Sequence, residues 1–98
     1  MLVRIVKLGI DTKHIDAFLA NFEASKEKIR GFNGCNFLEL YQEKDNKNVF
    51  FTYSYWDSKK ALNNYRHSDL FQGIWAKTKP MFNTKPEAWS VDKLHSLE

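Results

Sequence analysis

The chain begins with a short apolar run and continues with a segment in which apolar residues recur at helical spacing. Residues 2–9 are mostly β-formers, are largely apolar on both faces, and predict a first strand. Asp11 supplies a helix N-cap, and residues 13–30 carry their large apolar side chains on one helical face. A helix is therefore predicted there, and Gly31 marks its end.

Two further strands are predicted at residues 36–42 and 49–56, because both are rich in β-formers and the polar residues 43–48 are typical of a turn. Neither face of the strand at 49–56 carries a charge. Its side chains form two sets, Val49, Phe51, Tyr53 and Tyr55 on one face and Phe50, Thr52, Ser54 and Trp56 on the other. A strand with one face in water would alternate more clearly, so both faces are predicted to be covered.

The C-terminal half predicts a broken helix followed by a last strand. An N-cap signal at Ser58 begins the helix, and a second one at Ser68 restarts it, which places a kink or break near His67. Residues 88–94 follow a proline-containing loop and have the alternating pattern of a strand.

The resulting order of elements, β-α-β-β-α-β, predicts an α+β fold of the ferredoxin-like type. Its four-stranded antiparallel sheet carries two helices on one face. The other face would expose several hundred Å² of apolar surface to water, at a cost of roughly 25 cal/mol per Å². A second copy of the chain is the commonest cover for such a face, so we expect a homodimer.

Composition narrows the class of protein. The length of 98 residues suits one domain spanning residues 1–98, and an aromatic content of 15% suggests a ring-lined pocket, a buried interface, or both. The 15 basic and 12 acidic residues are interspersed, so the net charge of +3 does not indicate a nucleic-acid partner. No apolar run suits a membrane span or signal peptide, and the single cysteine, Cys35, cannot form an intrachain disulfide, so a cytoplasmic protein is expected. The three scattered histidines predict no metal site.

Two segments carry a family resemblance. The run FFTYSYWDSKKAL at residues 50–62, followed by HSDLF at 67–71, resembles the antibiotic biosynthesis monooxygenase (ABM-type) domain of the dimeric α+β barrel superfamily. The run IRGFNG at 29–34 is similar to the same domain, and the resemblance covers almost the whole chain. It implies a dimer whose sheets pack face to face, with a substrate cavity in each subunit between helices and sheet.

The same resemblance implies oxygen chemistry without metal, flavin or any other cofactor, on a small aromatic or quinol-type substrate. An electron-rich phenol or hydroquinone is deprotonated and its anion passes an electron to O₂, while the pocket supplies base, desolvation and shape. A second hypothesis is a non-catalytic dimer that binds a small apolar ligand or serves as a stress-linked protein. Haem degradation is disfavoured, because residues 2–9 lack the asparagine of that branch, and Tyr65 and Trp75 replace its tryptophan and histidine.

Three residues are candidates for catalysis. His67 is suited to act as general base, since imidazole titrates near neutral pH, but the favoured alternative is a histidine that caps the broken helix or bonds a backbone carbonyl. Trp56 stands where the family tends to place a cavity tryptophan, and it also suits a core ring between sheet and helix. Arg4 lies within an apolar strand, so its charge either reaches solvent or meets a buried anion, such as a partner carboxylate or an ionised substrate.

Four further rings are candidate substrate-binding residues, namely Tyr53, Tyr65, Phe71 and Trp75. Core packing is the alternative interpretation, because aromatic residues at helical spacing usually fill the core.

Overall fold

The computed structural model describes residues 1–98, and its elements follow the predicted order. The strands are β1 (Leu2–Gly9), β2 (Cys35–Gln42), β3 (Val49–Trp56) and β4 (Glu87–Asp92). The helices are α1 (Ile15–Arg30), α2 (Lys59–Arg66) and α3 (Asp69–Thr78). Single 3₁₀ turns precede α1 at Thr12–His14 and follow α3 at Lys79–Met81. None of the helices has the length and apolar content needed to cross a membrane.

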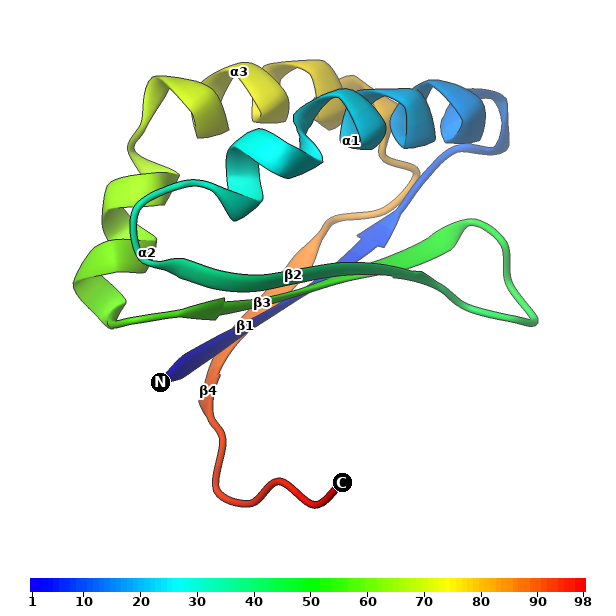
Figure 1. Ribbon diagram of the computed structural model, residues 1–98. Coiled ribbons are helices and arrows are strands. Elements are labelled where there is room, and N and C mark those ends of the chain that lie inside the picture. The colour runs from blue at the N-terminus through cyan, green and yellow to red at the C-terminus, as the bar shows by residue number, and fades with distance from the viewer.

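The four strands form one antiparallel sheet in the order β2-β3-β1-β4. All three helices lie on one side of this sheet, and no helix covers the other side (Figure 1). The ferredoxin-like fold predicted from the sequence is therefore confirmed, with the second helix divided into α2 and α3.

Side-chain caps explain where the helices begin. Asp11 caps the 3₁₀ turn ahead of α1. The Ser58 hydroxyl accepts a hydrogen bond from the Ala61 amide at 3.1 Å, and the Ser68 hydroxyl accepts one from the Phe71 amide at 3.1 Å. Each cap satisfies an amide that has no partner within its helix, so α2 and α3 both have a start fixed by local sequence.

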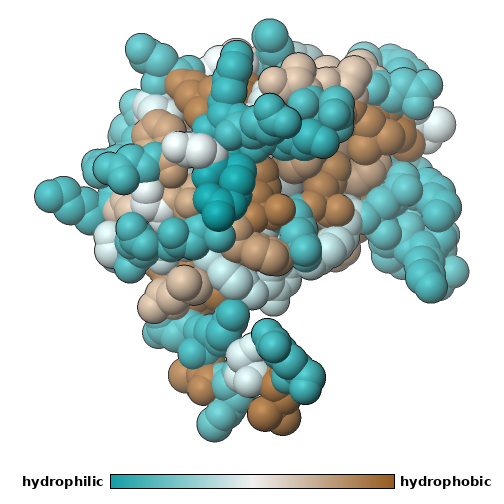
Figure 2. All heavy atoms as spheres, viewed as in Figure 1, coloured by the Kyte–Doolittle hydropathy of each residue, from teal (hydrophilic) through white to brown (hydrophobic).

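The inner face of the sheet, toward the helices, packs against two buried clusters. One contains Leu8, Ile10, Phe18 and Phe50, and the other contains Cys35, Trp56 and Leu62. Hydrophobic residues also reach the surface between the helix layer and the sheet (Figure 2). This layer between helices and sheet holds the cavity described below, which members of both clusters line.

The outer face is the sheet surface that no helix covers. Strand register assigns three residues of each strand to it: Val3, Ile5 and Lys7 of β1; Phe37, Glu39 and Tyr41 of β2; Phe51, Tyr53 and Tyr55 of β3; and Glu87, Trp89 and Val91 of β4. Aromatic rings on this face contact one another across strands, with Phe37 and Tyr55 stacked at 4.4 Å between centroids. Trp89 is 45% exposed and Val91 is 41% exposed. The outer face thus presents a largely apolar and aromatic surface, with charged groups only at Lys7, Glu39 and Glu87.

Gly34 holds the one left-handed backbone position in the chain, with φ 94°. Gly31 does end α1 as predicted, but with an ordinary φ of −83°. A Cβ added at Gly34 would lie 2.6 Å from the Cβ of Ala61, whereas one added at Gly73 in α3 meets nothing within 4 Å. The conformational need for glycine is therefore at Gly34, where the chain enters β2.

Gly34→Ala is expected to lower the free energy of unfolding by about 1–3 kcal/mol, because alanine is strained at this φ and clashes with α2. Gly73→Ala is the matched control, and it is expected to raise the free energy of unfolding by about 0.5–1 kcal/mol through helix propensity. Urea unfolding measures both. A Gly34→Ala chain as stable as the parent would contradict the prediction.

Candidate functional site

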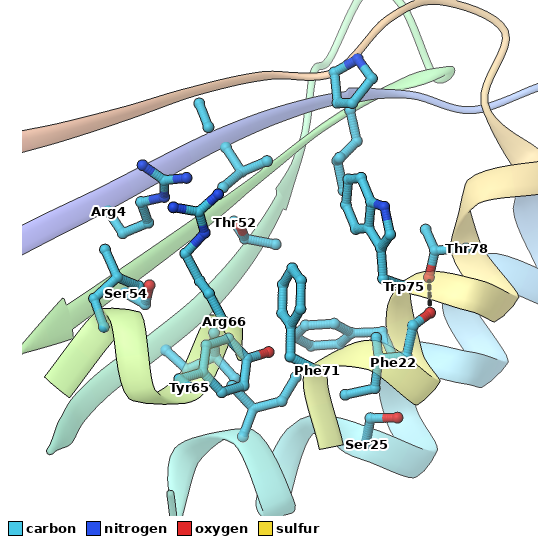
Figure 3. Close-up of a pocket in the computed structure, with 18 of the residues that line it drawn as sticks. Arg4, Phe22, Ser25, Thr52, Ser54, Tyr65, Arg66, Phe71, Trp75 and Thr78 are labelled. Atoms are coloured by element: carbon cyan, nitrogen blue, oxygen red, sulfur yellow. Dashed lines mark hydrogen bonds between the residues drawn. The ribbon is translucent and has the colours of Figure 1, made fainter. Parts of the chain in front are cut away.

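A cavity of about 360 Å³ lies between the inner face of the sheet and the helices. Its walls are mostly apolar and come from all four strands and all three helices. Figure 3 shows many of the lining side chains, with Phe22 and Ser25 of α1 on the side facing α3. Ligand pockets typically measure about 300–1,000 Å³, so this cavity suits a molecule of one or two fused rings.

Four rings form an aromatic chain along the cavity, comprising Trp56, Tyr65, Phe71 and Trp75. Trp56 stacks on Tyr65 with 4.9 Å between centroids, and Tyr65 meets Phe71 edge to face at 5.2 Å. Phe71 then stacks on Trp75 at 5.7 Å and 13°. These separations lie in the favourable range for ring pairs, so the aromatic chain is a preformed apolar wall.

The break between α2 and α3 is what brings Tyr65 and Phe71 together. In an unbroken helix, side chains six residues apart would point about 120° away from each other. The Ser68 hydroxyl donates to the Tyr65 carbonyl at 2.6 Å and accepts from the Phe71 amide at 3.1 Å. The same hydroxyl therefore ends one helix, starts the next, and turns both rings toward the cavity.

Two arginines lie at one end of the cavity and form what we call the arginine pair. Arg4 comes from β1 and Arg66 from the last turn of α2, and their guanidinium groups point toward each other (Figure 3). Arg4 donates a hydrogen bond to the Ser90 hydroxyl at 3.0 Å. Burial, and then the nearby charge of Arg66, lower the pKa of Arg4 from its usual value. A guanidinium pKa starts so far above neutrality that Arg4 remains cationic despite this lowering.

The other polar groups of the cavity are hydroxyls and an amide. Burial raises the pKa of Tyr65, so its phenol stays protonated at neutral pH and can donate a hydrogen bond. The Ser54 hydroxyl accepts a hydrogen bond from the Trp56 indole at 3.0 Å, and Asn21 donates one to the Thr78 hydroxyl at 3.2 Å. No histidine, lysine or carboxylate lines the cavity. No three His, Cys, Asp or Glu side chains anywhere in the chain come together as a potential metal site.

Most of the site residues expected from the sequence meet at this cavity, namely Arg4, Trp56, Tyr65, Phe71 and Trp75. His67 is not among the lining residues. It is exposed and is the C-cap residue of α2, with its Nδ1 2.7 Å from the Asn63 carbonyl. Tyr53 lies opposite Ile5 on the outer face of the sheet. The structure therefore separates His67 and Tyr53 from the other candidates.

Sequence reasoning missed Arg66 as a cavity residue. The available signal was its spacing from Leu62, because residues four apart share a helical face and Leu62 is only 4% exposed. His67 follows Arg66 directly, and one residue turns a helix by about 100°, so the two side chains leave the helix in different directions.

Known proteins share the fold of this chain. The family model described as antibiotic biosynthesis monooxygenase matches residues 1–77. A crystal structure of an antibiotic biosynthesis monooxygenase superposes with a TM-score of 0.90 at 19% identity, covering 97% of this chain and 100% of that chain. Rv0793 from Mycobacterium tuberculosis gives a TM-score of 0.89 at 18% identity, with 99% and 98% covered. A conserved protein from Methanosarcina mazei Go1 gives 0.88 at 20% identity, with 95% and 93% covered. No curated protein matches the chain in sequence.

Proposed function

The chain belongs to the antibiotic biosynthesis monooxygenase family, and we propose that it is a monooxygenase-like protein that oxidises a small phenol or hydroquinone with O₂. The cavity carries this proposal, because an aromatic chain and an arginine pair line the same space of about 360 Å³. The rings of the aromatic chain suit a flat aromatic substrate, and the cationic arginine pair suits the substrate anion that reacts with O₂.

The proposed reaction needs no reductant other than the substrate. With hydroquinone, one oxygen atom of O₂ enters the ring and the other leaves as water, so the products are hydroxybenzoquinone and water. The substrate loses four electrons and O₂ gains four, which closes the balance without a cofactor.

The chain's residues have separate roles in this proposal. The arginine pair favours the anionic form of a bound phenol, because nearby positive charge lowers the pKa of an acid. No imidazole or carboxylate lines the cavity, so the phenol proton leaves to solvent rather than to His67. The half-buried Tyr65 hydroxyl is a hydrogen-bond donor for a substrate oxygen, and the aromatic chain keeps water from the reacting ring.

We also propose that two copies of the chain pair through the outer face. The support is an apolar, aromatic sheet surface that no helix covers, with residues such as Trp89 and Val91 more than 40% exposed in the single chain. Two-fold pairing would bury this surface against an identical one.

Hydroquinone turnover under ¹⁸O₂ tests the proposed function. Metal-free protein is expected to consume O₂ above the uncatalysed rate and to give a product with one added ¹⁸O, read by mass spectrometry after immediate reduction of the quinone. Autoxidation gives benzoquinone without that added atom, so it is distinguished. Arg4→Gln is expected to lower the rate about tenfold or more, through loss of charge at the substrate anion.

His67→Ala is the matched control for this experiment, because His67 adjoins Arg66 in sequence but lies outside the cavity. It is expected to keep the full rate. Uptake no faster than without protein would overturn the proposed function, and hydroquinone binding without turnover would instead favour the non-catalytic hypothesis.

A further inference from the structure

The arginine pair has no anionic partner within the chain. The two ion pairs present join Lys7 to Glu87 and Lys26 to Glu23, and neither includes an arginine. No aspartate or glutamate lines the cavity. The one hydrogen bond that the Arg4 side chain donates goes to the neutral hydroxyl of Ser90. Two positive charges therefore face each other at the end of an apolar space with nothing to balance them.

An anion bound at this end of the cavity would balance the repulsion between the two guanidinium groups. Arg4 is partly buried, and this burial together with the nearby charge of Arg66 lowers the pKa of Arg4, whereas Arg66 itself is exposed at the mouth of the cavity. Guanidinium groups match a carboxylate in shape, since each presents paired N–H donors to paired oxygens. A neutral phenol balances neither charge before it ionises.

The neighbouring aromatic chain indicates what the anion is attached to. Tyr65 adjoins Arg66 in sequence, and both line the cavity with Phe71 and Trp75. In Figure 3 the two guanidinium groups lie at one end of the site and Trp75 lies at the other, with Phe71 between. A ligand that satisfies both ends has a flat apolar body and one acidic group at its edge.

We propose that the ligand of this cavity is an aromatic carboxylic acid, with its carboxylate held by Arg4 and Arg66 and its ring against the aromatic chain. The inference rests on the proposed function, in that it takes this cavity as the substrate site, and it narrows the substrate to a phenol or hydroquinone that carries a carboxylate. One carboxylate balances one of the two guanidinium charges. The remaining positive charge still favours ionisation of the phenol.

A pair of redox-inert probes tests the inference by isothermal titration calorimetry on the purified protein. 2-Naphthoate and 2-naphthamide share one shape, but only the first is an anion. Naphthoate is expected to bind about tenfold tighter or more, because hydrogen bonds to a charged partner are stronger than those to a neutral one. Arg4→Gln and Arg66→Gln are each expected to weaken naphthoate binding about tenfold and to leave naphthamide binding unchanged.

Two further variants separate the effect of charge in the cavity from charge elsewhere and from the shape of the guanidinium group. Lys59→Gln removes the same charge from the exposed start of α2, outside the cavity, and is expected to change neither affinity. Arg66→Lys keeps the charge but loses the paired donors, and is expected to fall between the parent and Arg66→Gln. Urea unfolding of each variant verifies that it folds.

Equal affinity for naphthoate and naphthamide would overturn the inference, as would an Arg66→Gln chain that loses both probes equally. A shift of either arginine variant from dimer to monomer in sedimentation would also overturn it, because the anion would then be a carboxylate of a second copy. Neither probe reacts with O₂. Naphthoate binding that depends on the arginines, combined with no turnover of either hydroquinone or the carboxylated hydroquinone 2,5-dihydroxybenzoate, would refute the proposed reaction alone.

Discussion

Trp56→Ala is expected to lower the free energy of unfolding by about 3–5 kcal/mol, the largest loss we expect from any single truncation in this chain. Trp56 is 1% exposed, stacks on Tyr65 at 4.9 Å, and meets Phe32 edge-on at 6.4 Å. Its indole N–H donates to the Ser54 hydroxyl at 3.0 Å. Truncation leaves a void among these rings and an unpaired hydroxyl, and urea unfolding measures the sum.

Two comparison variants separate the core role of Trp56 from its place on the cavity wall. Trp56→Phe keeps most of the ring and loses the N–H, so a smaller loss of about 1–3 kcal/mol is expected, and this variant stays folded if Trp56→Ala does not. Trp75→Ala truncates a partly exposed ring of the same aromatic chain. If Trp56→Ala cost no more than Trp75→Ala, Trp56 would be a pocket wall and not a core ring.

The fold was predictable where its signals are local. The hairpin strand at 49–56 was predicted with its observed bounds, and the break near His67 follows from a serine cap that acts within four residues. The last strand was predicted at 88–94 but observed as Glu87–Asp92. Its end depends on a distant partner, since Asp92 pairs with Leu2 at the start of β1 and the residues after it have no strand to pair with.

The site was less predictable, because it depends on which face of the sheet the helices cover. β3 is uncharged on both faces, so its own pattern could not place Tyr53 outside the cavity and Ser54 inside. The register with β1 decides this, by setting Tyr53 beside Ile5 and Ser54 beside Arg4. His67 is a titratable residue at the helix break, but it caps α2 outside the cavity, while Arg66 lines the cavity because it shares a helical face with the buried Leu62.

The same separation of faces makes Trp89 a test of the proposed pairing. Trp89→Lys is expected to raise the dissociation constant of the dimer about 100-fold or more, because a buried tryptophan contact is lost and a charge must be desolvated. Trp89 is 45% exposed in the single chain and lies on the edge strand β4 of the outer face, beside Ile5 of β1. The single chain therefore tolerates lysine there, and sedimentation over a range of concentrations reads pairing separately from folding.

Leu19→Lys is the matched control, since Leu19 is 40% exposed on α1, away from the outer face, and gains the same charge. It is expected to leave the dissociation constant unchanged. A parent chain that is monomeric at micromolar concentration would contradict pairing altogether. Dissociation by Leu19→Lys and not by Trp89→Lys would show that the dimer contact lies on the helices. The outer face would then need another cover, because exposing its apolar rings to water costs free energy.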